Sequence, residues 1–288
     1  MKPELCIKLD YLQERKNPAE IFDAMSLYIN AYRDFGQLMA NSLGIEGDFD
    51  FQLNAIESGS ILSKLSALPG KLDDIFESAC YKSGNNTFAE LVNVDETETE
   101  QQVEELAVNI ETSLADNTPE QIADPHIDRQ NLAYVLRSFS LANEKIKSGE
   151  SVFFRSSNGL KSECRVNTKW RFTGNPKEMF QGSTQSYDGK LNLVAKISVN
   201  EGNSVWTFRC ERIKQPFSAR IIHKEWLEKY QTGLIQPVGA KDVITAHVSY
   251  DIYTPAKGKG EPVIRNAKIK EITEIKRNTV YQHELSSF

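Results

Sequence analysis

Aromatic and basic side chains that could bind an oligonucleotide gather in the second half of the sequence. The segment SVWTFRCERI places Trp206, Phe208, Arg209 and Arg212 close together. Aromatic rings can stack on bases, and Lys or Arg side chains can contact phosphates. We therefore expect a nucleic-acid or acidic-protein interface. Its candidate contacts are Arg171, Phe180, Arg209, Arg212, Lys257, Lys259 and Arg265.

The spacing of the aromatic residues limits what they can do. Trp206, Phe208 and Cys210 alternate, so they lie on one face of a strand. Such a face more often belongs to a buried core than to a stacking surface. We expect Trp206 and Phe208 to lie mainly in the core. The long loops at 173–189 and 256–262 are then the better places for ligand contacts.

Catalytic patterns are missing from the sequence. It has no GxGxxG, GxxxxGK[ST], GxSxG or HExxH motif, and its four histidines lack metal-ligand spacing. The sequence predicts no catalytic residue, no metal site and no cofactor. One alternative stays open: Asp251, Glu274 and Lys276 could form the carboxylate–ExK group of a metal-dependent nuclease.

The order of elements in the second half suggests a small barrel. Residues 160–276 read as three strands, a short helix at 223–232 and two further strands. This order resembles the OB-fold, a five-stranded Greek-key barrel. The resemblance implies oligonucleotide binding through strands two and three and the long loops. A β-sandwich would give a similar order of elements.

The first half reads as a mixed unit of strands and helices. Alternating residues predict a strand at 4–12, three- and four-residue spacing predicts a helix at 17–43, and 49–68 reads as a hairpin. Asn17, Pro18 and Glu20 suit the start of that helix. Further helices follow to Gly149. We predict an α+β fold with an N-terminal β-α-β-β unit, additional helices and a C-terminal antiparallel barrel or sandwich.

Charge divides the chain near Gly149. Residues 1–149 hold 12 Lys and Arg against 26 Asp and Glu, whereas residues 150–288 hold 22 against 14. We predict an acidic domain at 1–149 and a basic, β-rich domain at 150–288. A basic domain favours an anionic partner. Docking of the acidic half on the basic half, within a homo-oligomer, would also explain the division.

The sequence points to a cytoplasmic protein. Its four cysteines, at 6, 80, 164 and 210, are widely spaced and form no CxxC pair. No basic start is followed by an apolar run, as a secretory signal requires. No stretch approaches the length of apolar sequence that crosses a membrane.

The composite of strand, helix and hairpin followed by a β-rich half resembles uncharacterised two-domain bacterial proteins from mobile-element and phage-defence contexts. This resemblance implies a partner-binding or accessory role. We therefore expect a non-catalytic binding protein. Its N-terminal domain would recruit a protein, and its C-terminal domain would contact nucleic acid or an acidic protein surface.

Overall fold

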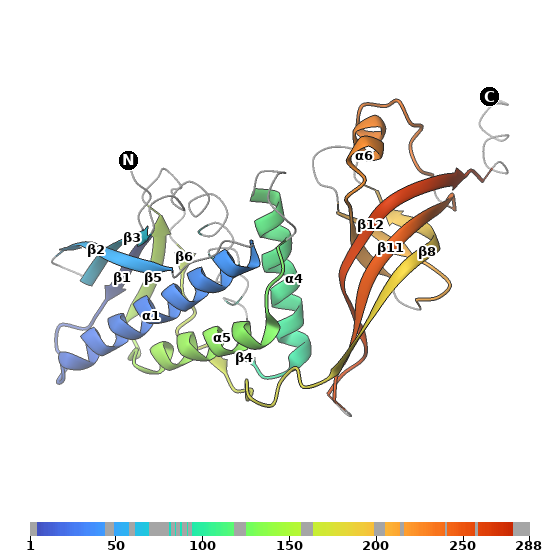
Figure 1. Cartoon of the computed structure of the whole chain (residues 1–288). Helices are drawn as coiled ribbons and strands as arrows, with labels where there is room; N and C mark the ends of the chain where they lie inside the picture. Colours follow the sequence, from blue (N-terminus) through green and yellow to red (C-terminus); the bar gives the residue numbers. More distant parts are fainter. Residues whose placement is uncertain are drawn as a thin grey trace, which may run out of the picture. The chain divides into compact units, whose positions relative to one another are not determined.

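The chain forms two compact units, Met1–Phe180 (unit 1) and Gln181–Phe288 (unit 2). Figure 1 shows the computed structural model from which they are described. The described residues are 5–43, 49–57, 61–68, 81, 84, 87, 91, 94–117, 125–156, 164–198, 205–213, 216–239, 241–256 and 259–278.

Unit 1 is built on a five-stranded sheet of order β2-β3-β1-β5-β6. Its strands are β1 (Leu5–Asp10), β2 (Asp50–Glu57), β3 (Ile61–Leu68), β5 (Ser151–Ser156) and β6 (Cys164–Arg165). Leu5, Ile7 and Leu9 alternate along β1, and all three are buried. The predicted β-α-β-β unit is confirmed by β1, α1 (Ala19–Ser42), β2 and β3.

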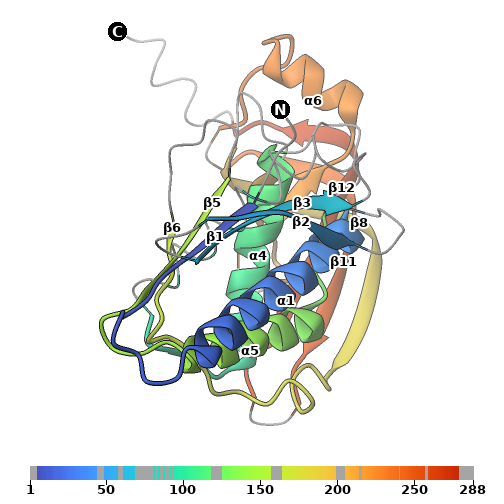
Figure 2. The ribbon, with the colours of Figure 1, turned by 90° about the vertical axis from the view of Figure 1, so that its left-hand side faces the viewer.

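Helices α1 and α5 (Arg129–Glu144) lie side by side against this sheet (Figure 2). Tyr32 of α1 joins the layers, since its ring centroid lies 5.2 Å from that of Phe154 on β5 and 6.2 Å from that of Phe139 on α5. The Tyr28 hydroxyl donates a hydrogen bond to Asn143 Oδ1 at 2.6 Å. These contacts make the helix–sheet interface the core of unit 1.

The chain after β5 stays in unit 1. β7 (Arg171–Phe172) pairs in parallel with β4 (Glu96–Thr97), which precedes α4 (Glu100–Asn117). The buried Trp170 indole donates from Nε1 to Thr97 Oγ1 at 3.1 Å. Segment 164–180 therefore completes the first unit and does not begin the second.

The division between the units lies after Phe180, not at Gly149 as predicted. β5 follows Gly149 directly and pairs with β1 from Leu5↔Ser156 to Asp10↔Ser151. The composition does become β-rich at this point. The first of the new strands, however, fills a place in the N-terminal sheet.

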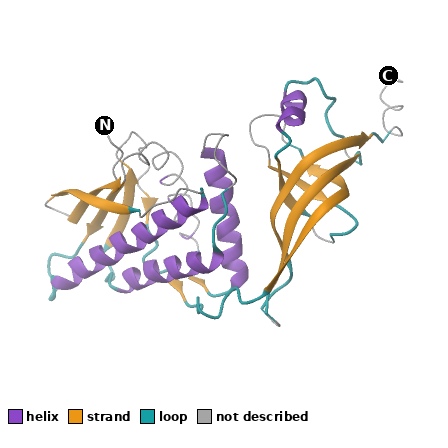
Figure 3. Cartoon of the chain, viewed as in Figure 1, coloured by secondary structure: helices purple, strands orange, loops and turns teal. Residues whose placement is uncertain are grey.

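Unit 2 is a closed barrel of order β10-β12-β11-β8-β9, drawn in orange in Figure 3. Its strands are β8 (Ser183–Ile197), β9 (Val205–Arg209), β10 (Phe217–Ile221), β11 (Val243–Thr254) and β12 (Val263–Lys276). β10 and β12 are parallel and the other neighbours antiparallel. Helix α6 (Lys224–Gln231) joins the third strand to the fourth. The predicted α+β class with an OB-like barrel is thus confirmed.

Individual barrel strands differ from the prediction. Residues 160–172 do not supply the first strand, because β6 and β7 belong to unit 1. The first strand is β8, which takes in Ser183–Gly189 from the predicted loop at 173–189. The third strand is β10, which was not predicted.

Aromatic side chains fill the barrel, as their alternation predicts. Trp206 and Phe208 are both fully buried. The Trp206 ring centroid lies 4.9 Å from that of Tyr230 and 5.8 Å from that of Trp226, both on α6. The helix therefore closes one end of the barrel through aromatic packing.

Gly36 offers a test of packing in unit 1. It is buried in α1, where a Cβ atom would lie 2.2 Å from Cε1 of the buried Phe49 ring. In an open helix, Gly→Ala is stabilising by about 1 kcal/mol. Here we expect Gly36→Ala to lower the free energy of unfolding by about 1–3 kcal/mol through overpacking, measured by urea denaturation.

The exposed Asn30 on the same helix provides the control. Asn30→Ala should be neutral or slightly stabilising, since only helix propensity changes. Adding Phe49→Leu to Gly36→Ala should cost less than the sum of the two single changes. A stabilising effect of Gly36→Ala alone would contradict the packing.

Candidate functional site

The outer surface of β9 and β10 is the best candidate interface in unit 2. Burial alternates along both strands, so Thr207 and Arg209 point outward from β9, and Ser218 and Arg220 point outward from β10. The register aligns Thr207 with Ser218. Among the described outward residues of these two strands, none is a carboxylate.

The positive charge continues onto β12. Arg220 pairs with Lys268 in the parallel ladder, so both side chains lie on the outer face while the neighbouring Ile269 is fully buried. We call Arg209, Arg220 and Lys268 the basic strip.

Exposed aliphatic side chains flank the basic strip. Ile197 is 61% exposed and pairs with Thr207, and Ile222 is 41% exposed just after β10. Large apolar side chains beside cations are suited to a ligand that has both flat apolar rings and negative charge. A nucleic acid is such a ligand.

Arg212 lies beyond β9, in the turn that leads to β10. Its guanidinium carbon is 4.3 Å from the ring centroid of Tyr187 on β8. Arg212 is exposed, whereas Tyr187 is half-buried against the barrel core. The structure thus places two predicted contact residues, Arg209 and Arg212, near one end of the same hairpin.

Of the other predicted residues of unit 2, Arg265 lies on β12, and Lys259 lies between β11 and β12. Arg265 holds its guanidinium carbon 3.9 Å from the ring centroid of Tyr253. Lys259 is exposed in the turn between the strands, where its amide donates to Ala256 O at 2.9 Å. Lys257 lies outside the described residues.

Two predicted contact residues belong to unit 1 and have structural roles there. Arg171 donates from Nη1 to the carbonyl oxygens of Thr168 and Trp170, at 2.8 and 2.9 Å. Phe180 is half-buried against the unit 1 core, and its amide donates to Glu100 Oε1 at 3.0 Å. Both residues therefore belong to unit 1 and not to the barrel of unit 2.

Sequence reasoning missed Arg220, Lys268, Ile197 and Ile222. A signal for β10 is present in FSARI, where Phe217, Ala219 and Ile221 are buried in alternation. The run is only five residues long, too short for its alternation to identify a strand by itself. Without β10, the pairing of Arg220 with Lys268 could not be predicted.

The structure separates the residues of the nuclease alternative. Glu274 pairs with Thr245, six residues before Asp251 on β11, so the two carboxylates stand roughly 20 Å apart along the strand. Asp251 accepts hydrogen bonds from Ser186 at 2.6 Å and Asn266 at 2.8 Å. Within the part of the chain that the structure describes, no group of three His, Cys, Asp or Glu residues could hold a metal ion.

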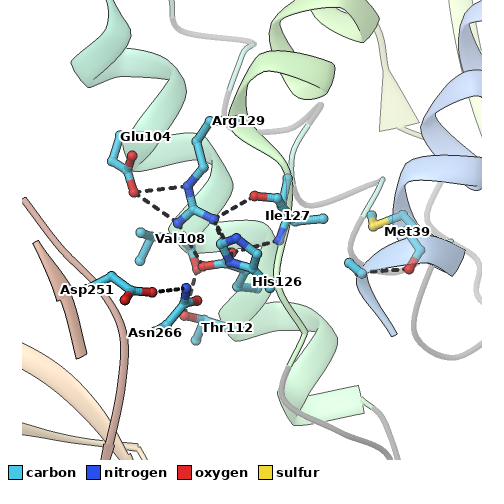
Figure 4. Close-up of polar contacts among 11 residues, drawn as sticks. Met39, Glu104, Val108, Thr112, His126, Ile127, Arg129, Asp251 and Asn266 are labelled. Carbon is cyan, nitrogen blue, oxygen red and sulfur yellow. Dashed lines mark hydrogen bonds and ion pairs between the residues drawn. The ribbon is translucent and has the colours of Figure 1, made fainter. Parts of the chain in front are cut away.

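Unit 1 contains a buried ionic cluster that the sequence did not reveal (Figure 4). Arg129, at the start of α5, donates to Glu104 Oε1 from Nε at 3.0 Å and from Nη2 at 2.9 Å. It also bonds Glu111 on α4 and the Ile127 carbonyl oxygen. Its side chain is only 4% exposed. This cluster joins α4 to α5 and leaves no donor set aimed at a ligand, so we interpret it as structural.

Comparison with known proteins gives no match: no protein-family model, no curated protein and no solved structure is detectably similar to this chain. Among the described helices, none is long and apolar enough to cross a membrane. The geometry of the barrel surface is therefore the basis on which a function can be proposed.

The ionic cluster predicts acid sensitivity of unit 1. Burial by itself would raise the pKa of Glu111, but hydrogen bonding from His126 and the charge and hydrogen bonds of Arg129 lower it below its usual 4.5. A lowered carboxyl pKa contributes stability above pH 4.5 that is lost as pH falls through the folded-state pKa. We expect the free energy of unfolding to fall in this acid range.

Glu111→Gln should weaken that acid dependence and lower stability near pH 7, measured by urea unfolding across the pH range. The exposed Glu105, on the same helix, is the control. Glu105→Gln should leave the pH profile close to that of the wild type. Parallel profiles for the wild type and Glu111→Gln would refute this assignment.

Proposed function

We propose that the protein is a non-catalytic nucleic-acid-binding protein that contacts phosphates through the basic strip of unit 2. The observation that carries this proposal is the placement of Arg209, Arg220 and Lys268 on the outer face of an OB-like barrel. In this fold, oligonucleotides bind across strands two and three. Here those strands are β9 and β10.

The geometry of the strip suits an extended polyanion. Arg220 pairs with Val205, four residues before Arg209 on β9, so the two arginines are separated by about 13 Å along the strand direction. Phosphate contacts made by such spread cations release counterions, which gives affinity without reading sequence. The intervening Thr207 and Ser218 hydroxyls can add hydrogen bonds to phosphate oxygens.

The charge of the two units supports the same assignment. With the boundary after Phe180, unit 1 holds 18 Lys and Arg against 29 Asp and Glu, and unit 2 holds 16 against 11. A polyanion is attracted by the second unit and repelled by the first. In this proposal unit 1 binds a protein partner. The resemblance to bacterial phage-defence proteins suggests an accessory role in such a system.

The opposite charges of the units also support a second candidate, a homo-oligomer in which unit 1 of one copy binds unit 2 of another. Screening weakens contacts between exposed charges. Light scattering should then report a larger mass at low salt than at high salt. A constant monomer mass would remove this candidate and leave the basic strip available for nucleic acid.

Loss of a strip cation should weaken nucleic-acid binding in a salt-dependent way. We expect Arg209→Ala and Arg220→Ala in the full chain each to reduce affinity for a single-stranded oligonucleotide about tenfold at low salt. The slope of log affinity against log salt should fall by about 0.7 per lost phosphate contact. Fluorescence anisotropy titrations at several salt concentrations measure both.

Lys190→Ala is the matched control, since Lys190 is an exposed cation on the β8–β11 surface and pairs with His247. It should change neither value appreciably. Equal losses in all three variants would show that net charge, not the basic strip, determines binding. Absence of any nucleic-acid binding by the wild type at low salt would reject the proposed function.

A further inference from the structure

The Arg212–Tyr187 pair differs from the cations of the basic strip because its guanidinium lies over an aromatic ring. The separation of 4.3 Å between the guanidinium carbon and the ring centroid is that of a close cation–π contact. The Tyr187 hydroxyl donates to Lys190 O at 3.2 Å, which fixes the ring on β8. The ring in turn restricts the orientation of the arginine.

The ring of Tyr187 is supported from inside the barrel. Its centroid lies 4.9 Å from that of the buried Tyr250, and the planes are tilted by 30°. The Tyr250 hydroxyl is buried and has no hydrogen-bond partner among the described residues. An unsatisfied buried polar group costs about 1–3 kcal/mol and calls for an explanation. Tyr250 thus packs against Tyr187 from the barrel core.

We propose that the Arg212–Tyr187 stack is a platform for one unpaired base, which makes single-stranded nucleic acid the preferred ligand. This inference rests on the proposed function and deepens it. Arg212 is exposed, so a flat ring can stack on the guanidinium from the solvent side, as bases do on arginine planes in single-strand recognition. Bases within a duplex are already stacked on their neighbours and cannot reach it.

Packing within the barrel explains why an arginine would take this role. Trp206 and Phe208 on β9 are fully buried, so their rings cannot meet a base. Arg212 follows the same strand and can combine a planar surface with a positive charge. Because the Tyr187 ring already orients the guanidinium, less side-chain entropy is lost when a base binds.

The test separates stacking from charge. Affinity of the full chain is measured by anisotropy for an oligothymidylate and for an abasic oligonucleotide of equal length. Stacking of one base should make the wild type favour the base-bearing strand by about five- to a hundredfold. Arg212→Lys keeps the charge but removes the plane. It should lower that preference at least fivefold and leave affinity for the abasic strand nearly unchanged.

Two Tyr187 variants and one control complete the design. Tyr187→Leu should lower the preference as Arg212→Lys does, whereas Tyr187→Phe keeps the ring and should retain most of the preference. Arg155 is an exposed arginine on β5 of unit 1, and Arg155→Lys should have no effect. Arg212→Lys changes an exposed residue, so the test survives if Tyr187→Leu fails to fold.

The outcomes distinguish this inference from the proposed function. Binding of both strands with no preference for bases, or a preference unchanged in Arg212→Lys, overturns the stacking platform alone. An equal loss for both strands in Arg212→Lys makes Arg212 a phosphate contact and also overturns it. Failure of the wild type to bind either strand at low salt overturns both.

Discussion

Closure of the barrel is the constraint on which the surface of unit 2 depends. Every inward position on β9 and β10 must fill the interior, and Trp206, Phe208, Phe217, Ala219 and Ile221 do so. Strand alternation then assigns Thr207, Arg209, Ser218 and Arg220 to the outside. The aromatic residues of these strands lie in the core, so the outer face carries the polar and basic residues. That face is basic, hydroxylated and edged with aliphatic side chains, and the proposed binding of anions follows from this division.

Because the barrel is closed, an aromatic ring that supports a ligand must lie at the periphery of the barrel. A ring that supports a ligand must have one face free, which an inward residue of a small closed barrel cannot offer. Tyr187 and Tyr253 lie where β8, β11 and β12 run past their neighbours, and each carries an arginine over its ring. Tyr253 is 3% exposed, and Gly182 passes so closely that a Cβ would lie 2.8 Å from the Tyr253 ring. Gly189 passes Tyr187 just as closely, since a Cβ would lie 2.8 Å from its hydroxyl, but Tyr187 is half-buried and Arg212 is exposed, whereas Arg265 is half-buried. Of the two pairs, Arg212–Tyr187 is therefore the one that a ligand can use.

Local patterns in the sequence predicted the fold well where the contacts are local. The alternation of Leu5, Ile7 and Leu9, the spacing of α1 and the hairpin of β2 and β3 all gave the correct elements, as did the alternation that buries Trp206. The domain boundary and the first barrel strand required knowledge of pairing between distant segments. Nothing in SVFFRS reveals that it pairs with β1, more than a hundred residues earlier. The candidate site was predicted in part for the same reason. Arg209 lies on a strand that the sequence predicts and Arg212 follows it, whereas Arg220 and Lys268 become neighbours only through the parallel β10–β12 ladder.

In the proposed function, phosphate contact and base stacking are made by two different parts of unit 2. The basic strip would provide affinity that falls with salt and is indifferent to base identity, because phosphates are alike along any strand. A guanidinium held on a tyrosine adds a contact that only an unpaired base can make, and this contact depends little on salt. The chain as a whole is acidic, with a formal net charge of −6, so a polyanion gains nothing from general attraction. In the proposed function, binding therefore depends on where the positive charge is placed, and the barrel places Arg209, Arg220 and Lys268 at outward positions of β9, β10 and β12.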